Sequence, residues 1–451
     1  MVIFIIGSIW IVNPYFYSLL VATLFAALYF SSRDLIKSTW LTFIPVFLFY
    51  RAFYYTSPVI FQNGFFVSYS DPLLIFLLGL LFIRQNRSPN RGGVNGAPGG
   101  VTATMILIAI LGIISSWFSK MPEVSYFYLL QLIKFFVVFL ISPTLIGDKK
   151  IAKATLEIIF LFVLFNSLLI GLQKANGGPL GLPIESPNLF AKYGRFADES
   201  PGLYRPGGIT TGPNEMATAI GLTLPMLVAL GITKNKFNRR FIWICLGASA
   251  AALMFTAARA VWILMLIILP IIYLRIRKTT GYSLPVPVAK YGRTALIIVG
   301  ILFLPMFIQR ILSVQDLIKP GGGAIYRIHH LIAAAELMKS HPVGVGMNVF
   351  QYAIVEEFDP EYIFYDSTPA HNILAEIGAD FGAVGIPLFL LLFYFMVKSS
   401  TATAKIKNPI SIGAVGCLIV YIMLLQVHPW LFERSASSLF WLMAGVYVKS
   451  N

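Results

Sequence analysis

Long apolar runs recur along the whole of this chain and limit the folds that it can adopt. About 20 apolar residues are needed to cross the hydrocarbon core of a bilayer, and most of the runs are of that length. Only 12% of the 451 residues are charged, against about 25% in a soluble domain, so lipid must solvate much of the surface. The sequence therefore predicts an all-α polytopic membrane protein of about 12–14 transmembrane helices.

The runs are separated by turn residues and by short basic segments. Residues 1–12 are either a short extra span or an interfacial helix. The other runs lie at about 15–31, 40–56, 70–84, 101–118, 124–146, 151–172, 212–231, 239–257, 258–276, 293–310, 371–398, 409–427 and 430–448.

The distribution of charge predicts the orientation of the spans. A net charge of +15 would suggest nucleic acid for a soluble protein. Here the Lys and Arg residues gather in alternate short connections, which indicates cytoplasmic loops and contact with anionic lipid rather than nucleic acid. The two longest loops, about 173–211 and 311–370, carry most of the acidic residues. We therefore expect these two loops on the outer face.

Several kinds of site are not indicated. Cys245 and Cys417 both lie in apolar runs, which predicts two buried thiols without a disulfide or a metal-binding spacing. The glycine-rich stretch 92–100 lacks the Lys-Ser/Thr ending of a phosphate-binding P-loop, so a flexible linker is the better interpretation. We expect no metal and no cofactor.

Polar residues gather where three spans begin on the predicted outer face. These are Asn214, Arg259 and His371. Thr210 or Thr211 is expected to cap the first of these helices, and Pro213 suits its first turn. Each helix directs the positive end of its dipole outward. The starts of the three helices thus predict one polar site.

Arginines near helix N-termini favour a polyanionic ligand, and the outer leaflet offers a lipid-linked phosphate or pyrophosphate. Arg205, Arg259 and Arg327 are the candidate cations, the last of them on a helix that we expect to end near Lys339. His371 is the candidate base, because a helix N-terminus disfavours the imidazolium and leaves the ring able to accept a proton. Cations and one base would suffice for attack of a hydroxyl on a phosphate-linked sugar.

Each of these residues also has a purely structural interpretation. Arg259 can snorkel to the interface, since an arginine at the end of a span costs little. His371 can cap its helix, Arg205 can pair with Asp198 or Glu199, and Arg327 can be a solvated helix residue.

Other polar residues are expected to be structural. We expect His329, His330 and His341 on the surface, and the acidic run 356–366 to be a solvated face rather than a cation site. Glu376 and Asp380 are four residues apart on one helix face, which favours packing in the bundle interior over chemistry. Lys134 lies in the middle of a span and must reach either a cavity or a carboxylate.

The resemblance of the chain to a known family rests on four segments in order. They are Arg-Pro-Gly-Gly-Ile-Thr-Thr-Gly-Pro-Asn at 205–214, Ala-Ala-Arg-Ala-Val-Trp at 257–262, a segment at 327–350 that contains His-Pro-Val-Gly-Val-Gly, and His-Asn followed by Asp-Phe-Gly-Ala-Val-Gly within 371–385. With these segments the chain resembles the O-antigen ligase and Wzy polymerase superfamily, which includes O-oligosaccharyltransferases. Asp380 stands where the family usually has Glu, Ala258 where it has Ser, and the Trp expected after Arg327 is absent.

The resemblance implies a membrane glycosyltransferase with a GT-C-like fold and a long, partly helical periplasmic loop. Such an enzyme takes a glycan from undecaprenyl pyrophosphate without a metal or nucleotide. Carried onto this sequence, Arg205, Arg259, Arg327 and Asn214 would bind the pyrophosphate. His371, with Arg259, would carry catalysis by activating an acceptor hydroxyl. The acceptor would be lipid A-core or another glycan.

The resemblance also predicts the organisation of the chain. Residues 205–398 would form the catalytic region, including the periplasmic loop 311–370, between membrane helices in 1–204 and in 399–451. The protein would lie in the bacterial cytoplasmic (inner) membrane with its active site facing the periplasm. An O-antigen ligase is favoured, and a Wzy-type polymerase is the alternative. A flippase or other transporter would need internal repeats, and a scaffold would not need Arg259 and His371 at one depth.

Overall fold

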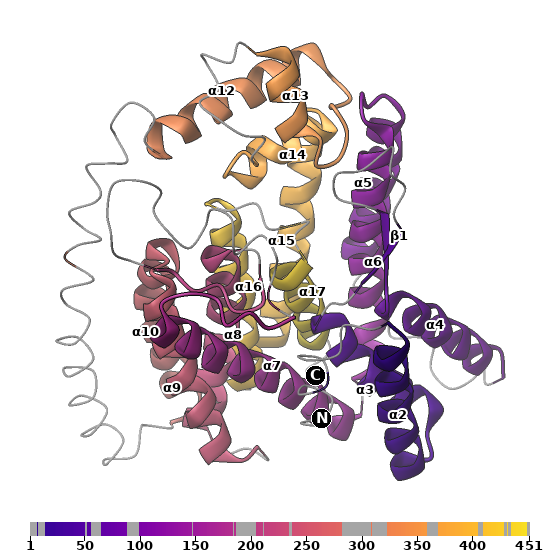
Figure 1. Ribbon diagram of the computed structural model, residues 1–451, viewed down its shortest axis with the longest axis vertical. Coiled ribbons are helices and arrows are strands. Elements are labelled where there is room, and N and C mark those ends of the chain that lie inside the picture. Colours follow the sequence, from indigo (N-terminus) through magenta and orange to yellow (C-terminus); the bar gives the residue numbers. More distant parts are fainter. Residues whose placement is uncertain are drawn as a thin grey trace.

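The predicted all-α polytopic fold is confirmed by a computed structural model of the chain (Figure 1). Among the residues that it describes, seven helices are long and apolar enough to cross a membrane, and four shorter helices are apolar. The chain is therefore a multi-pass membrane protein. The structure describes residues 7, 14–49, 52–55, 65–87, 99–146, 148–183, 185, 204–210, 212–233, 237–281, 308, 323–358, 369–404, 409–427, 431 and 434–448.

The elements follow one another along the chain as helices, with one short β-hairpin near the start. The first half contains α2 (Pro14–Ser32), α3 (Leu35–Leu48), β1 (Ala52–Tyr55), β2 (Phe65–Ser68), α4 (Ser70–Arg87), α5 (Gly99–Trp117), α6 (Pro122–Leu145), α7 (Lys149–Asn176) and α8 (Pro213–Ile232). The second half contains α9 (Arg239–Thr256), α10 (Arg259–Thr280), α12 (Gly323–Ser340), α13 (Phe350–Glu357), α14 (Ile373–Phe381), α15 (Gly385–Ala404), α16 (Pro409–Leu425) and α17 (Arg434–Val448).

Two predicted spans are wrong in detail. The run 40–56 does not continue as one helix, because α3 ends at Leu48 and residues 52–55 pair with 65–68 as an antiparallel hairpin. The aromatic residues of this stretch favour a strand, which the count of apolar residues could not distinguish from a helix. The run 371–398 is divided into α14 and α15. The runs 1–12 and 293–310 lie outside the described residues apart from Gly7 and Ile308.

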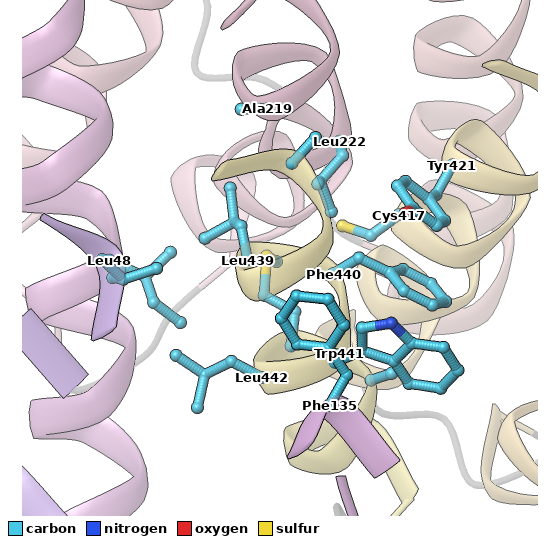
Figure 2. Close-up of a cluster of buried hydrophobic side chains, with 14 of the residues drawn as sticks. Leu48, Phe135, Ala219, Leu222, Cys417, Tyr421, Leu439, Phe440, Trp441 and Leu442 are labelled. Carbon is cyan, nitrogen blue, oxygen red and sulfur yellow. The ribbon is translucent and has the colours of Figure 1, made fainter. Parts of the chain in front are cut away.

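Helix α8 lies at the centre of the bundle. In the most apolar 18-residue stretch of each helix, 94% of the residues are buried in α8, against 28% in α10 and 6% in α2. Helices α10 and α2 therefore present apolar side chains outward. Such outward apolar faces suit contact with lipid. Figure 2 shows the core beside α8, where Trp441 and Phe440 of α17 meet Tyr421 of α16 and Phe135 of α6.

Both cysteines are buried in the apolar core. Cys417 lies among these aromatic side chains in Figure 2, and Cys245 is buried on α9. Both are free thiols, as the sequence predicted. A free thiol behaves as a small apolar group in such a place.

The charge within α6 is neutralised by a neighbouring segment. The ammonium nitrogen of Lys134 lies 3.1 Å from Oδ1 of Asp71, at the start of α4. Asp71 also accepts the backbone N–H of Ser68 at 3.0 Å. Lys134 therefore reaches a carboxylate, which is one of the two outcomes expected from the sequence. An ion pair with further hydrogen bonds is the form in which a charge is tolerated inside a bundle.

Helices α12, α13 and α14 form a layer at one end of the bundle, above α15 in Figure 1. Its small core contains Ala334, Leu337 and Phe350. This layer is the described part of the long loop predicted between residues 311 and 370, together with the start of the following run. It brings Arg327 and His371 to the end of the bundle from which α8 and α10 start.

Candidate active site

The loop that carries Arg205 is tied to the end of α7. The side-chain amide of Gln173 donates to Oε1 of Glu185 at 2.6 Å and to the carbonyl of Gly208 at 3.0 Å. In return its oxygen accepts the N–H of Gly208 at 3.0 Å. Each of these polar groups is buried, so each needs the partners that it has. The network holds residues 204–210 against the bundle.

Arg205 joins the start of α8 to the end of α9. Its Nε donates to the carbonyl of Thr256 at 2.8 Å, and Nη2 donates to Oδ1 of Asn214 at 2.7 Å. The predicted partners Asp198 and Glu199 lie outside the described residues. Neither of these bonds involves a carboxylate, so the positive charge of Arg205 is not neutralised through them. Arg205 and Asn214 are thus brought together, as predicted.

The start of α8 differs in part from the prediction. Pro213 occupies the first turn as expected, but the N-cap is Gly212, with no side-chain hydrogen bond to the cap. Thr210 is not the cap, because its hydroxyl lies within donating distance of the carbonyl oxygens of Gly207 and Gly212, at 2.7 and 2.9 Å. Thr211 lies outside the described residues. The first N–H groups of a helix without a side-chain cap can serve an anion.

Arg259 is placed by a sharp reversal between α9 and α10. Ala257 ends α9 in the left-handed conformation with φ +52°, and its N–H donates to the carbonyl of Met254 at 3.1 Å. The indole N–H of Trp262 donates to the carbonyl of Leu253 at 2.8 Å, which ties the first turn of α10 to the last turn of α9. Arg259 is the first residue of α10 and is half-buried. The motif at 257–262 therefore both forms the turn between α9 and α10 and supplies the charge of Arg259.

Arg327 lies on the exposed face of α12, within electrostatic range of Arg259. Partial desolvation, and then the positive charge of Arg259, lower the pKa of the Arg327 guanidinium. Two arginines that repel each other in this way gain from an anion placed between them. The structure thus brings Arg259 and Arg327 together although 68 positions separate them in the sequence.

His371 precedes α14 and does not cap it. Asn372 is the N-cap, and its Oδ1 accepts the N–H groups of Leu374 and Ala375 at 3.0 and 3.1 Å. The interpretation of His371 as a capping residue is therefore wrong. The histidine itself has φ +52°, a conformation that costs free energy for a residue with a side chain.

The electrostatic surroundings of His371 favour the neutral imidazole. Burial, followed by the positive charge of Arg327 and electrostatic coupling to the nearby His330, lowers its pKa to about 4, against the smaller opposing effect of a hydrogen bond to the backbone of Val427. The sequence predicted a neutral ring because of the helix N-terminus. The direction agrees, but burial and the neighbouring Arg327 supply the main causes. A neutral imidazole at pH 7 can accept a proton.

The glycine-rich turn after His341 and the end of α14 fit each other. The N–H groups of Val345 and Gly346 donate to the carbonyls of Ala379 and Asp380 at 2.9 and 3.2 Å. Gly344 and Gly382 both have positive φ, and a side chain on either would collide with the backbone of the other segment. Two motifs that are separate in the sequence are therefore one structural unit. The same turn explains why the run 371–398 breaks at Gly382.

The buried carboxylate of Asp380 belongs to this unit. It accepts the N–H groups of Asn348 and Phe350 at 2.6 and 3.1 Å, at the start of α13. A carboxylate at a helix N-terminus is favoured by the helix dipole. The structure thus agrees with a packing role for Asp380, as the sequence suggested.

The histidines of the layer differ in their exposure. The prediction that all three lie on the surface is wrong for His330, which is 1% exposed and packs edge-on against Phe350. His341 is partly exposed, with Nε2 2.9 Å from Oε1 of Glu357. That carboxylate also lies 2.8 Å from the ammonium nitrogen of Lys120, which connects the layer to the end of α5. No group of three potential metal ligands occurs among the described residues.

Some residues that support the site were not singled out from the sequence. Gln173 and Glu185 hold the Arg205 loop, and Trp262 holds the first turn of α10. The only signal for Gln173 was a polar residue at the end of an apolar run, which must find a partner if it is buried. The partner itself could not be read from the sequence.

Comparison with known families supports the motif analysis. Residues 244–393 match the model of the family described as O-antigen ligase, Wzy_C. The match includes Arg259, Arg327 and His371, whereas Arg205 and Asn214 lie before it. No curated protein matches the chain. The predicted resemblance is thus confirmed over the segment that carries the arginine–histidine cluster.

Proposed function

Because residues 244–393 match the O-antigen ligase family, which implies a membrane enzyme of the glycan ligase or polymerase kind, we propose a more specific function. The chain transfers a glycan from undecaprenyl pyrophosphate to an acceptor hydroxyl, as an O-antigen ligase does. The transfer takes place at the periplasmic face of the bacterial cytoplasmic membrane. The observation that carries this proposal is the position of Arg327, which lies within electrostatic range of both Arg259 and a neutral His371.

The arginines stabilise the leaving group. In the transfer, the acceptor oxygen forms a bond to the anomeric carbon, and the bond from that carbon to the pyrophosphate oxygen breaks. The electron pair of the broken bond leaves with undecaprenyl pyrophosphate, whose negative charge rises. Arg259 and Arg327 face this charge, and Arg205 and Asn214 border it from the start of α8. Fixed cations at a developing charge are worth about 10²–10³-fold in rate each.

His371 takes the proton of the acceptor. Its imidazole is neutral near pH 7, so it can remove the hydroxyl proton as the oxygen attacks. The imidazolium that results lies beside Arg327 and is disfavoured there. The proton is therefore returned readily to solvent, and the base is regenerated for the next cycle.

Replacement of His371 tests the mechanism. We expect His371→Ala to abolish glycan transfer in a strain that lacks its own copy of the gene, with glycan followed on a lipopolysaccharide gel. The purified variant should still bind undecaprenyl pyrophosphate in detergent, because the arginines remain. Normal transfer by this variant would contradict the mechanism.

The same deletion strain separates the ligase from the polymerase. A missing ligase leaves long glycan chains on undecaprenyl pyrophosphate, whereas a missing polymerase leaves single repeat units there. We expect long chains. Single units would assign the chain to the polymerase branch of the same chemistry.

A further inference from the structure

The backbone around His371 needs support from outside its own segment. A histidine with φ +52° is in the left-handed region, which residues with a side chain rarely adopt. Such a conformation persists only where the surroundings hold it. The residues that hold Pro369 and Ala370, directly before His371, therefore decide where the imidazole lies.

Glu376 holds this segment from within α14. Its Oε2 accepts the N–H of Ala370 at 3.1 Å, and the side chain is only 2% exposed. A buried carboxylate is costly unless it makes strong hydrogen bonds. Here the carboxylate reaches back beyond the start of α14 and fixes the residue that precedes His371, six positions before its own.

His330 holds the same segment from α12. Its Nδ1 lies 3.3 Å from the carbonyl oxygen of Pro369. Because a carbonyl only accepts, Nδ1 must carry the hydrogen, which selects one tautomer. Burial, and to a lesser extent the charge of His329, lowers the pKa of His330 to about 4 against the opposing effect of this bond, so the ring is neutral near pH 7. A neutral, buried ring of fixed tautomer can hold the Pro369 carbonyl at a fixed distance from α12.

His330 also connects the base with a cation. Arg327 precedes it by three residues on α12, so the two residues are neighbours on successive turns of one rigid helix. The bond to Pro369 therefore sets the separation between the helix that carries Arg327 and the segment that carries His371. His330 and Glu376 act on neighbouring residues from two different helices.

We propose that His330 and Glu376 are positioning residues, which hold the Pro369–Ala370 backbone between them and so keep His371 near Arg327. This inference rests on the proposed function of His371 as the base. Packing alone does not account for the pair, because apolar side chains would fill the same space beside Phe350 and Ala334 without the cost of burying an imidazole and a carboxylate.

The test compares variants that remove the contacts to this backbone with variants that restore them. His330→Leu and Glu376→Leu remove the two polar contacts, whereas His330→Asn and Glu376→Gln keep a donor and an acceptor. Glu336→Gln is the matched control, since Glu336 is exposed on α12 and pairs only with Lys339 in the described contacts at 2.7 Å. Full-length protein is placed in proteoliposomes with donor and acceptor lipids extracted from the deletion strain, and kcat and donor KM are measured.

We expect each leucine variant to lower kcat by about ten-fold or more, since a small displacement of a reacting group has effects of this size. Donor KM should stay within about two-fold, because the cations remain. His330→Asn and Glu376→Gln should recover most of the lost kcat, and Glu336→Gln should match the unaltered protein. Should His330→Leu fail to accumulate, His330→Gln takes its place, since it keeps an amide but displaces it by one methylene.

Two results would overturn the inference. One is an unchanged kcat in the leucine variants, and the other is a rise in donor KM that equals the whole loss of kcat/KM. His371→Ala in the same assay separates this inference from the proposed function. If His371→Ala is active, the proposed mechanism fails and the inference with it. If His371→Ala is inactive while His330→Leu and Glu376→Leu keep normal kcat, only the inference fails.

Discussion

The two sides of the candidate site are built in different ways. The arginine side consists of Arg205, Asn214 and Arg259 at the ends of α8, α9 and α10. There, Arg205 bonds a backbone carbonyl and an amide oxygen, and these two bonds fix the position of its guanidinium. The histidine side consists of Arg327 and His371 on the α12–α14 layer. There, burial and the charge of Arg327 lower the pKa of His371 and so keep its imidazole neutral.

This difference matches the needs of one reaction. In the proposed reaction, a leaving pyrophosphate requires cations held in fixed positions, whereas an attacking hydroxyl requires a base without a proton. The arginine side belongs to the membrane bundle, and the histidine side belongs to the layer above it. The reacting groups would meet at the junction between them.

The largest effect is expected from removing the charge of Arg259, at the start of α10, on the arginine side of the site. We expect Arg259→Ala to lower kcat by about 10²–10³-fold, because a fixed cation at the leaving group is lost. Arg259→Lys should recover part of the rate, since it restores the charge but not the planar fork. Rates are measured in proteoliposomes. Arg277→Ala, at the opposite end of the same helix and exposed, is the control and should have normal activity. Equal activities for Arg259→Ala and Arg277→Ala would remove Arg259 from the site.

A smaller effect is expected at Arg205, which both carries charge and joins two helices. Arg205→Lys keeps the charge but cannot bond Thr256 and Asn214 through one fork. We expect a loss of about ten-fold in rate and a destabilisation of about 1–3 kcal/mol, as for the loss of hydrogen bonds to a charged group. Thermal unfolding and transfer rates measure the two effects.

The control for Arg205 is the partner on α8. Asn214→Ala removes the same bond from the other end, so the effects of Arg205→Lys and Asn214→Ala should not add in the double variant. Additive losses would show that the two residues act separately. In that case the arginine side would be a set of independent ligands rather than one fixed unit.

The smallest effect is expected in the pH dependence of the histidine side. With the pKa of His371 near 4, transfer by the unaltered protein should stay constant as the pH falls from 8 to about 6, where an ordinary histidine of pKa about 6.5 would already be protonated. Arg327→Gln removes a neighbouring cation, which makes the imidazolium less unfavourable and raises the pKa of His371. The variant should therefore lose activity at a higher pH than the unaltered protein.

This prediction is measured as the ratio of rates at about pH 5 and about pH 7.5 within each variant, so that a general loss of rate in Arg327→Gln does not matter. We expect the ratio to fall by about two- to five-fold. Glu336→Gln on the same helix should leave it unchanged. An acid limb that does not move in Arg327→Gln would mean that His371 is not the group that titrates.

Much of the site could be predicted because its charged residues stand at the starts of helices. Arg259 and His371 were placed at one face from the lengths of the spans and the positions of Lys and Arg. Arg205 and Asn214 belong to one sequence motif that leads into α8, and the structure joins them directly. The order of the apolar runs thus predicts that these residues lie on the same face.

The partners of these residues could not be predicted, because they come from other segments. Nothing near Arg205 in the sequence points to the carbonyl of Thr256, and nothing near His330 points to the carbonyl of Pro369. His330 is even predicted at the surface, since periodicity does not say which face of a loop helix is covered by another loop. Backbone carbonyls carry no sequence signal at all.

Hydrophobic length and charge are local properties of the chain, so the membrane fold, the order of most spans and the set of polar residues that can form a site could be predicted from the sequence. Which of those residues meet, where the run at 371–398 breaks and in which conformation His371 is held became visible only in the folded chain. These outcomes depend on contacts between distant segments, such as the turn at Gly344 against Gly382, and on the few hydrogen bonds that a buried polar group must find.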